Sequence, residues 1–395
     1  MKPTKRGRQV ISFLLACLLL VLATLGVHAE ATPISTESVG TESAAMELPC
    51  RSAVLMDAKT GQILFEQNGG EALPPASVTK IMTLLLVMEA IDSGSISLSD
   101  MVSVSANAAS MGGSQVYLKE GESMSVEEML KCVVIASAND CAVALAEYVA
   151  GSEEQFVAKM NARAAELGMT ATNFENTNGL DDTATNHVTS AMDIAIMSRA
   201  LIAHEKILEY SGIWMDTVRD GAFGLTNTNR LVRFYRGCTG LKTGSTAKAK
   251  FCISATAERD GLSLICVIMA AESRDVRNQA AAKLLDFGFA TYSSFEAEGG
   301  EGSVPVRGGV LSACRYTYGA FAHTVAKGSA ARVEKSIELA DTLIAPVEAG
   351  AEIGRVVYRL AGEEIGSVPI LAAESVGKIS FGVLFYRILQ QFLLL

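Results

Sequence analysis

The chain has 395 residues, which is enough for two or three domains, and 49% of them are hydrophobic, so a sizeable core can form. Charged residues make up only 19% of the chain, which argues against a largely disordered protein. The formal net charge of −10 argues against nucleic acid as a main partner, because binding to phosphates requires a basic surface.

Residues 1–29 have the pattern of a signal peptide. Lys and Arg residues gather among the first eight positions, an apolar run follows from 10 to 27, and Ala29 is a small residue suited to cleavage. We therefore expect an exported protein. The alternative is an uncleaved membrane anchor, since the run is long for a signal. Residues 30–46 are rich in Thr, Ser, Glu and Ala, a composition that predicts a flexible linker.

The ordered part is predicted to begin near Leu48, with strands at 52–58 and 62–67 joined by a turn. Paired strands are also expected at 251–257 and 262–270, around an Asp260-Gly261 turn. The polar stretch 168–188 is predicted to be a long loop, the kind of segment that often carries function. Apolar spacing and capping residues predict helices at 77–91, 125–136, 140–149, 152–167, 190–202 and 280–292.

Strands at both ends of a helical region favour an α+β domain over residues 47–295, with helices packed on an antiparallel sheet. A stretch rich in Gly and Glu follows at 296–302. Beyond it, short β-branched runs separated by glycines predict a small all-β domain over 296–376. We find no internal repeat.

Residues 377–395 form the last predicted segment. Phe381, Leu384, Phe385 and Ile388 recur at helical spacing, and polar residues fall toward the opposite side. This pattern is typical of an amphipathic helix that lies in a membrane surface, which would hold the protein at the outer face of the cytoplasmic membrane. The alternative is a terminal helix packed on its own domain.

Several kinds of site have no support in the sequence. There is no HExxH motif, no CxxC pair and no G-x-S-x-G elbow, so nothing indicates a zinc site, a redox pair or an α/β-hydrolase. We expect neither a metal nor another cofactor. Cys132, Cys252 and Cys266 lie in apolar runs and are predicted to be core residues.

Ser77 and Lys80 provide a nucleophile and a base. At positions i and i+3 they lie on the same face of the helix predicted at 77–91. Lysine can accept a serine proton when burial or a neighbouring cation lowers its pKa. A serine at a helix start also lies beside free backbone N–H groups, one of which can stabilise an oxyanion. The S-x-x-K motif alone is weak, because it occurs twice more in this chain.

Two further motifs follow in order, each with a second copy to weigh against it. Ser137 and Asn139 lie between two predicted helices, where a short turn can direct both side chains into a cleft, whereas the copy at 105–107 reads as a turn. Lys242-Thr243-Gly244 is expected to lead into the strand beginning near Phe251, where a glycine lets a substrate backbone approach closely. The other K-T-G copy, at 59–61, falls in the first hairpin turn.

These three motifs, in this order, resemble the low-molecular-mass penicillin-binding proteins, the D-alanyl-D-alanine carboxypeptidase family of peptidase S11 type. Longer stretches resemble the family too, from PPASVTKIMTLLLVMEA to GLKTGSTAKAKFCISATA, and the resemblance extends over about 48–395. It implies a serine β-lactamase/transpeptidase-like domain, a small β domain and a C-terminal amphipathic helix. Ala138 stands where the family usually has glycine, and we expect little effect. Relatives of this type occur in sporulating Gram-positive bacteria, so a sporulation-associated subtype stays open.

The resemblance also implies roles for the motif residues. Ser77 would attack the penultimate D-alanine carbonyl with Lys80 as general base, while Ser137 relays a proton and Asn139 orients the substrate amide. Lys242 and Thr243 would bind the terminal carboxylate, beside Gly244. The backbone N–H groups of Ser77 and Ser245 would form the oxyanion hole. The expected partners are peptidoglycan stem peptides of the cell wall and, as covalent inhibitors, β-lactams.

Three alternatives remain open from the sequence. A class A β-lactamase would use a glutamate in an E-x-x-L-N segment, and none occurs between 140 and 241. A D,D-endopeptidase would share every catalytic residue with a carboxypeptidase. A catalytically silent wall-binding protein would fail to bind labelled penicillin although its motifs are intact.

Overall fold

The structure is a computed structural model that describes residues 46–393, with side chains described as far as 390. The predicted signal peptide at 1–29 and nearly all of the linker predicted at 30–46 lie outside the described residues.

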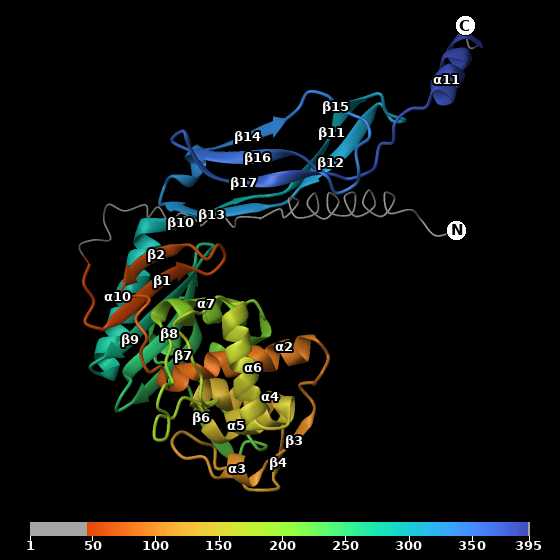
Figure 1. The fold of residues 1–395 in the computed structure, drawn as a ribbon. Helices are drawn as coiled ribbons and strands as arrows, with labels where there is room; N and C mark the ends of the chain where they lie inside the picture. The colour runs from red at the N-terminus through yellow and green to blue at the C-terminus, as the bar shows by residue number, and fades with distance from the viewer. Residues whose placement is uncertain (1–45, 394–395) are drawn as a thin grey trace, which may run out of the picture. The chain divides into compact units, whose positions relative to one another are not determined.

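A five-stranded antiparallel sheet organises the first part of the chain, with strand order β2-β1-β9-β8-β7 (Figure 1). Both pairs of strands predicted from the sequence are confirmed. Asp260 and Gly261, in the turn between β8 and β9, have φ of 53° and 78°, as a two-residue hairpin turn requires. The strands are β1 (Ser52–Asp57), β2 (Ile63–Gln67), β7 (Cys238–Thr246), β8 (Lys250–Arg259) and β9 (Leu262–Ala271).

Helices cover the sheet and form a second layer beside it. Helix α10 packs against β8 and β9, and α7 packs against β9 and β1. Strand β1 is buried along its whole length, which fits its near-continuous apolar sequence. The longer helices are α2 (Lys80–Asp92), α5 (Asn139–Ala150), α6 (Glu153–Glu166), α7 (Ala191–Ile202) and α10 (Arg274–Thr291). These five confirm the helices predicted at 77–91, 140–149, 152–167, 190–202 and 280–292, although α10 begins earlier than expected, at a Ser273 cap.

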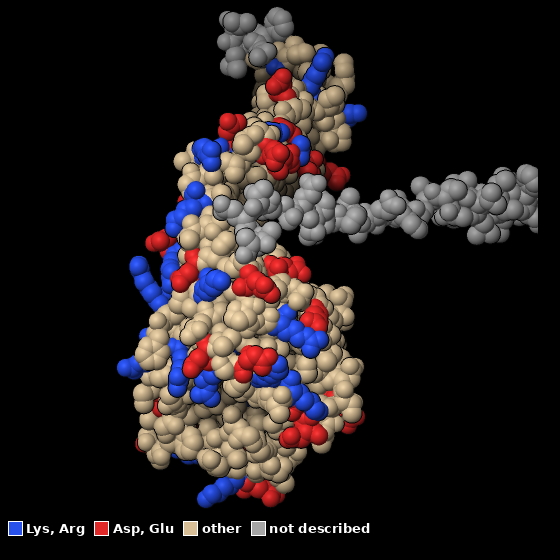
Figure 2. Space-filling view, turned by 90° about the vertical axis from the view of Figure 1, so that its left-hand side faces the viewer, with Lys and Arg blue, Asp and Glu red and all other residues tan. Residues whose placement is uncertain are grey.

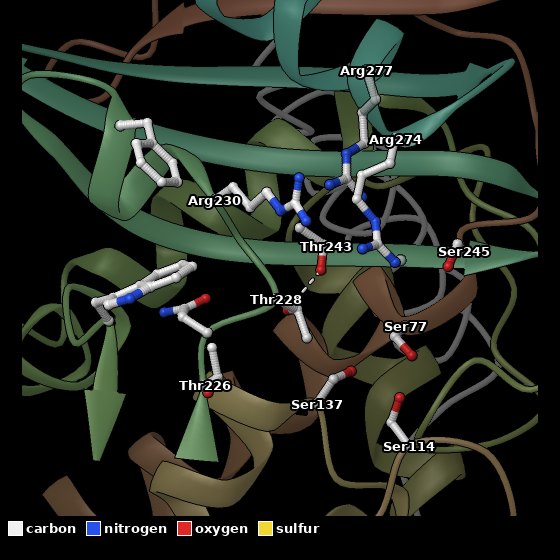
Figure 3. A pocket seen from close by; sticks show the side chains of 14 residues that line it. Ser77, Ser114, Ser137, Thr226, Thr228, Arg230, Thr243, Ser245, Arg274 and Arg277 are labelled. Carbon is white, nitrogen blue, oxygen red and sulfur yellow. Dashed lines mark hydrogen bonds between the residues drawn. The ribbon is translucent and has the colours of Figure 1, made fainter. Parts of the chain in front are cut away.

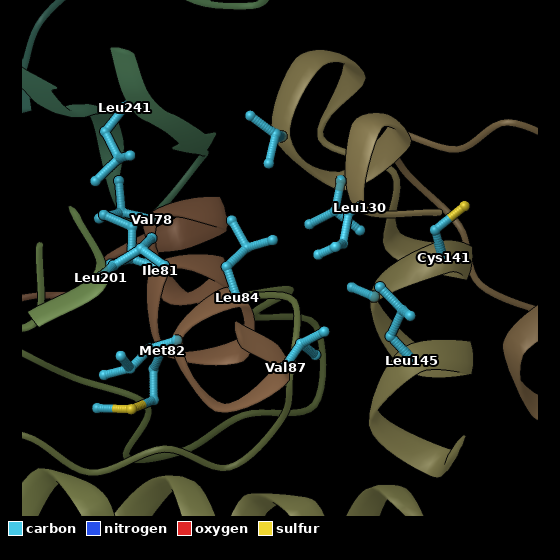
Figure 4. Close-up of a cluster of buried hydrophobic side chains, with 14 of the residues drawn as sticks. Val78, Ile81, Met82, Leu84, Val87, Leu130, Cys141, Leu145, Leu201 and Leu241 are labelled. Carbon is cyan, nitrogen blue, oxygen red and sulfur yellow. The ribbon is translucent and has the colours of Figure 1, made fainter. Parts of the chain in front are cut away.

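Helix α2 runs through the middle of the hydrophobic core. Figure 4 shows its side chains, such as Ile81 and Leu84, between Leu201 on one side and Leu130 and Leu145 on the other. The helix is apolar on nearly all sides, so it must be enclosed by other elements. Because Lys80 is its first residue, the same enclosure removes the Lys80 amine from water.

The helix predicted at 125–136 is confirmed only in its first half. Ser125 caps α4 (Val126–Lys131) by accepting a hydrogen bond from Glu128 N–H at 3.2 Å. A π-helical turn, η3 (Cys132–Ala136), then widens the helix. It ends at Ser137, whose left-handed φ of 64° turns the chain before α5 begins. The widened turn and left-handed residue are frequent features of functional sites.

One placement predicted from the sequence is wrong. Lys242, Thr243 and Gly244 are not a lead-in to the strand near Phe251; they lie inside a separate strand, β7, which ends at Thr246 and pairs with β8 at the edge of the sheet. The run of Lys, Thr, Gly and Ser has no apolar alternation because one side of β7 faces a polar cleft. The 3-10 turn η2 (Ala76–Thr79) forms the first turn of the helix predicted at 77–91. The elements that were not predicted are short: β3 (Met101–Ser103), α3 (Ala106–Ala109), β4 (Ser123–Ser125), α8 (Lys206–Ser211), β5 (Met215–Val218), β6 (Phe223–Thr226) and α9 (Leu231–Phe234).

The C-terminal all-β part is confirmed. Its larger sheet has the strand order β14-β16-β17-β12-β11-β15, and β10 pairs with β13. Tyr358, Val356 and Ile370 form one small core, and a second lies around Cys314. The strands are β10 (Tyr292–Ala297), β11 (Gly300–Arg307), β12 (Ala313–Tyr318), β13 (Phe321–Ala326), β14 (Val333–Leu339), β15 (Leu343–Ile344), β16 (Glu352–Leu360) and β17 (Glu363–Ala372), with a short 3-10 turn, η4, at Ala330–Arg332.

The last element is α11 (Phe381–Leu393), in the segment where the sequence predicts a helix. Among the helices of residues 46–393, none has both the length and the hydrophobicity that a transmembrane span requires. Cys132, Cys252 and Cys266 are fully buried core residues, as predicted. The seven cysteines of the described part, from Cys50 to Cys314, are all unpaired. Figure 2 shows acidic and basic side chains interspersed on one face of the molecule.

Candidate active site

A cleft of about 650 Å³ brings the predicted motifs together (Figure 3). Ser77, Ser137, Thr243, Gly244 and Ser245 line it. The other predicted residues, Lys80, Asn139 and Lys242, are buried directly behind this lining and are hydrogen-bonded to it or to one another. All the site residues predicted from the sequence therefore meet at one place, between the edge strand β7 and the helical layer.

Ser77 lies in the 3-10 turn η2, immediately before α2 rather than within it. The residue before it, Ala76, has a left-handed φ of 48°. Two glycines allow the chain to pack against this turn. A β-carbon on Gly244 would lie 2.9 Å from Ser77 N, and one on Gly179 would lie 1.9 Å from Ala76 O. The turn is thus held between β7 and the 168–188 loop, where only residues without a side chain fit.

The Lys80 amine is fully buried and has three oxygen atoms around it. Its Nζ lies 3.0 Å from Ser77 Oγ, 2.6 Å from Asn139 Oδ1 and 2.7 Å from the backbone oxygen of Asn178. Burial lowers the pKa of Lys80 well below its usual value, the positive charge of Lys242 lowers it further, and the Asp140 carboxylate opposes both. A neutral amine has two N–H donors and one lone pair. Since the two carbonyl oxygens can only accept, the lone pair is left for the Ser77 hydroxyl.

Lys242 lies on the opposite side of the cleft, behind Ser137. Its Nζ donates to Ser137 Oγ at 2.9 Å and to the Thr243 backbone oxygen at 3.0 Å. Burial and the nearby Arg277 lower the pKa of Lys242 to about 7. The left-handed backbone of Ser137 directs its hydroxyl toward this amine. Ser137 is thereby positioned between Lys242 and the open cleft, where it can pass on a proton.

Asn139 opens α5 and ties the motif to the neighbouring loop. Its Nδ2 donates to the Gly112 backbone oxygen at 2.7 Å, and its backbone N–H donates to the Ser114 oxygen at 2.7 Å. The residue before it, Ala138, has φ −59°, which any residue adopts. Alanine is therefore compatible with this backbone, in line with the small effect expected from the sequence.

Sequence reasoning missed the arginines of the cleft. Arg230, Arg274 and Arg277 gather on the side opposite Ser77 and Ser137, with Thr243 between the two sides (Figure 3). Arg277 is buried, which lowers its pKa to about 10, whereas Arg230 and Arg274 are exposed. Within residues 46–393, none of the three forms an ion pair with an Asp or Glu. They therefore form a positive side of the cleft that no carboxylate of the described chain neutralises, although Arg277 already donates to Asn278 Oδ1 and to the Cys252 oxygen.

The sequence does not indicate the role of Asn178 either, although it predicts that the loop at 168–188, which contains this residue, carries function. The predicted loop at 168–188 has no helix or named strand in the structure, and it supplies both the Asn178 oxygen at Lys80 and the glycine that fits against Ala76. A backbone oxygen leaves no trace in residue type. Only the unusual length of the loop could have indicated its role.

The second copies of the motifs have structural roles. Lys59-Thr60-Gly61 lies between β1 and β2, as predicted. Ser105 caps the short helix α3 by accepting from Ala108 N–H at 3.0 Å, so that copy begins a helix rather than a simple turn. Ser375 Oγ accepts from Ala349 N–H at 2.9 Å. In the described part of the chain, no cluster of three or more His, Cys, Asp or Glu side chains could hold a metal ion.

The fold and this cleft define a serine hydrolase of the penicillin-binding protein class. Residues 38–273 match the family described as D-alanyl-D-alanine carboxypeptidase, and residues 317–378 match the C-terminal domain of penicillin-binding protein 5. The chain is 42% identical over 339 residues to the D-alanyl-D-alanine carboxypeptidase DacF of Bacillus subtilis, covering 84% of this chain and 87% of DacF. The chain belongs to the D-alanyl-D-alanine carboxypeptidase family.

Solved structures agree with this assignment. Penicillin-binding protein 5 from Haemophilus influenzae matches with a TM-score of 0.76 and 30% identity, covering 84% of this chain and 99% of that one. Penicillin-binding protein D2 from Listeria monocytogenes, in its ampicillin-bound form, matches with a TM-score of 0.57 and 31% identity over 62% of this chain and 99% of that one.

Proposed function

We propose that this enzyme removes the terminal D-alanine from peptidoglycan stem peptides through an acyl-enzyme on Ser77. The observation that carries the proposal is the pairing of the Ser77 hydroxyl with a buried lysine amine, 3.0 Å away, in a cleft with a positive opposite side. Burial lowers the pKa of the amine and so favours the uncharged form that can act as a base, and the arginines favour a substrate that ends in a carboxylate.

Acylation begins when Lys80 takes the proton of Ser77. The serine oxygen then forms a bond to the carbonyl carbon of the penultimate D-alanine. The backbone N–H groups of Ser77 and Ser245 stabilise the resulting oxyanion. As the bond to the terminal D-alanine breaks, Ser137 passes a proton to the leaving amine, and Lys80 gives up the proton that it took from Ser77, so both side chains return to their starting states. Water then attacks the ester, with Lys80 again as base, and releases the shortened peptide.

The terminal carboxylate binds on the Thr243 side of the cleft. Thr243 Oγ1 now donates to Thr228 Oγ1 at 2.7 Å, and it can turn to a carboxylate oxygen. Arg277 supplies the charge from α10, and the buried Lys242 amine lies close behind. Asn139 and β7 hold the acyl part of the peptide on the other side. This orientation places the penultimate carbonyl over Ser77.

A β-lactam acylates Ser77 in the same way, but its leaving group stays attached. Among the described residues that line the cleft, none is Asp or Glu, so there is no carboxylate base to activate water. This favours a long-lived penicillin adduct over turnover, and thus a carboxypeptidase over a β-lactamase. A stable adduct combined with release of D-alanine from a pentapeptide is the expected behaviour.

Mass spectrometry of the penicillin-treated protein tests the proposal. The wild type is expected to gain one penicillin on the tryptic peptide that contains Ser77, and Ser77→Ala to gain none. Ser114→Ala removes another serine of the same cleft and should keep the adduct. An adduct that persists in Ser77→Ala, or a wild type that neither binds penicillin nor releases D-alanine, would reject the proposal. Muropeptide analysis of digested sacculi separates carboxypeptidase from endopeptidase activity.

The proposed location is the outer face of the cytoplasmic membrane, reached through the N-terminal signal and held by α11. Phe381, Phe385 and Ile388 on α11 are exposed large apolar residues, which supports a membrane-surface role. The test is co-sedimentation with phospholipid vesicles. The full chain after residue 29 should sediment, and a chain ending at residue 377 should stay in solution. Equal sedimentation of the two would remove α11 as the anchor.

A further inference from the structure

The cleft continues beyond Thr243, away from Ser77. Its volume of about 650 Å³ is in the range of pockets that hold ligands much larger than one alanine. This extension is lined by Trp214, Thr226, Asn227 and Phe234, none of which the mechanism uses. The cleft therefore has more room on this side than the removal of D-alanine requires.

Hydrogen bonds fix the position of this extension relative to the site. Thr243 Oγ1 donates to Thr228 Oγ1 at 2.7 Å, and the backbone N–H of Asn227 donates to the Trp214 oxygen at 2.9 Å. Figure 3 shows Thr226 and Thr228 on the side of Thr243 that is remote from Ser77. Since the substrate carboxylate binds at Thr243, the extension lies on the leaving-group side.

The end of the extension is an aromatic shelf formed by Trp214 and Phe234. The ring centroids are 6.1 Å apart in an edge-to-face arrangement, and the Arg233 guanidinium lies 5.6 Å from the Trp214 ring and 5.7 Å from the Phe234 ring. Phe234 is 72% exposed, although its ring lines the cleft. Trp214 is the only tryptophan of the chain. Aromatic rings held apart from the core in this way are suited to contact an apolar ligand group.

We infer that this shelf binds the side chain of the leaving D-amino acid when that side chain is larger than a methyl group. The enzyme then releases terminal D-amino acids with large apolar side chains as well as D-alanine. The inference rests on the proposed carboxypeptidase function, because it takes the leaving-group side from the position of the carboxylate. The reaction itself does not change. The same amide bond breaks and the same proton reaches the leaving amine, so only the side chain of the product differs.

Synthetic pentapeptides ending in D-Ala, D-Leu and D-Phe provide the test. The measurement is kcat/KM for release of the terminal residue by the wild type, Trp214→Ala, Phe234→Ala and Tyr148→Ala. Tyr148 is a matched control, being an aromatic residue with 41% exposure on α5 that does not line the cleft. We expect the wild type to release D-Phe and D-Leu within about tenfold of D-Ala, since an apolar side chain that gains a pocket can offset its bulk.

In Trp214→Ala and in Phe234→Ala, the ratio of kcat/KM for the D-Phe peptide to kcat/KM for the D-Ala peptide should fall about tenfold. The same ratio should be unchanged in Tyr148→Ala. The ratio is read within one preparation, so a loss of folded protein lowers both rates equally and does not imitate the effect. Phe234→Ala tests the inference with little effect on folding, because the ring that it removes is largely exposed. A wild type that releases D-Ala but neither D-Leu nor D-Phe overturns the inference, and so does an unchanged ratio in both shelf variants. Absence of D-Ala release would instead reject the proposed function.

Discussion

Gly244 on β7 faces the backbone nitrogen of Ser77, and a β-carbon at this glycine would lie 2.9 Å from that nitrogen. It would also lie 2.7 Å from the Pro75 oxygen and 2.9 Å from Val78 N, so the obstacles are backbone atoms that cannot rotate away. The edge strand and the nucleophile turn thus approach each other as closely as the backbone allows. This contact holds the proposed oxyanion donors, on Ser77 and Ser245, next to each other.

Replacement of Gly244 by alanine should therefore disrupt the oxyanion hole. Either β7 or the η2 turn must move, which separates the two backbone donors. We expect the rate constant for penicillin acylation to fall by about 100-fold, the usual effect of losing one oxyanion donor. Gly224→Ala is the matched control, since a β-carbon at Gly224 meets no atom within 4 Å. Equal acylation rates in the two variants would show that the close approach has no catalytic role.

The charge on Lys242 should set the lower pH limit of acylation. Lys80 must be neutral to accept the Ser77 proton, so the rate rises as pH increases through the pKa of Lys80. Because the positive charge of Lys242 lowers that pKa, Lys242→Gln should raise it and shift the acid limb to higher pH. Lys242→Arg keeps the charge and should leave the limb near its wild-type position. The measurement is the second-order rate constant of penicillin acylation as a function of pH. Identical acid limbs of this profile in the wild type and in Lys242→Gln would contradict an effect of the Lys242 charge on the pKa of Lys80.

His187 should make the stability of the enzyme depend on pH. The imidazole ring is buried, and its Nδ1 accepts a hydrogen bond from Glu175 N–H at 3.0 Å. The neutral ring therefore carries its proton on Nε2, which donates to Thr79 Oγ1 at 2.7 Å. Burial lowers the pKa of His187 to about 4, against 6.5 in an exposed histidine. The unfolded chain therefore binds more protons between pH 6.5 and 4, and stability falls as pH decreases through this window.

From pH 7 to pH 5 this residue should reduce the free energy of unfolding by about 2 kcal/mol, at 1.36 kcal/mol for each pH unit below the unfolded pKa. His187→Gln retains an N–H donor without a titrating group, so its stability should fall less over the same range. Denaturant unfolding of both proteins at several pH values measures the difference. Parallel losses in the two proteins would assign the pH dependence to other groups.

Local patterns in the sequence were enough to predict part of the site. Ser77 and Lys80 are three residues apart in a continuous helical stretch that passes from η2 into α2, so their proximity follows from helical geometry, and the 3.0 Å contact agrees. The cap at Ser125 and the hairpin at Asp260-Gly261 are likewise local. The meeting of these residues with Lys242 does not follow from spacing. It was predicted from the order of the motifs and the resemblance to a family.

Tertiary placement accounts for what the sequence could not indicate. β7 has a polar and glycine-rich sequence, and it is a strand because β8 offers a partner, with Lys242 opposite Ser254. Arg277 has no motif around it, and an arginine on a helix reads as a surface residue. It is buried because α10 packs against β8, which brings it over the cleft. The roles of such residues depend on which elements become neighbours.

Arg277 should recognise the terminal carboxylate of the substrate more strongly than its neighbour Arg274. Both side chains line the cleft from α10, but Arg277 is buried and Arg274 is exposed. A buried charge-assisted hydrogen bond contributes about 1.5–3 kcal/mol, whereas an exposed ion pair contributes below about 1 kcal/mol. Arg277→Gln should therefore lower kcat/KM for a D-Ala-D-Ala pentapeptide by about 10- to 100-fold, and Arg274→Gln by less than about fivefold.

A substrate with a terminal amide instead of a carboxylate shows whether this loss comes from carboxylate binding. The wild type should use the amide poorly, and Arg277→Gln should use it no worse than the wild type does, because the partner of the guanidinium is already missing. If Arg277→Gln lowered kcat/KM equally for both substrates, the arginine would act on the structure of the cleft, and the carboxylate would have to be bound elsewhere. The remaining positive groups for that task are Lys242, Arg230 and Arg274. Lys242 is the least suited of them, because its amine is already engaged by Ser137 and the Thr243 oxygen.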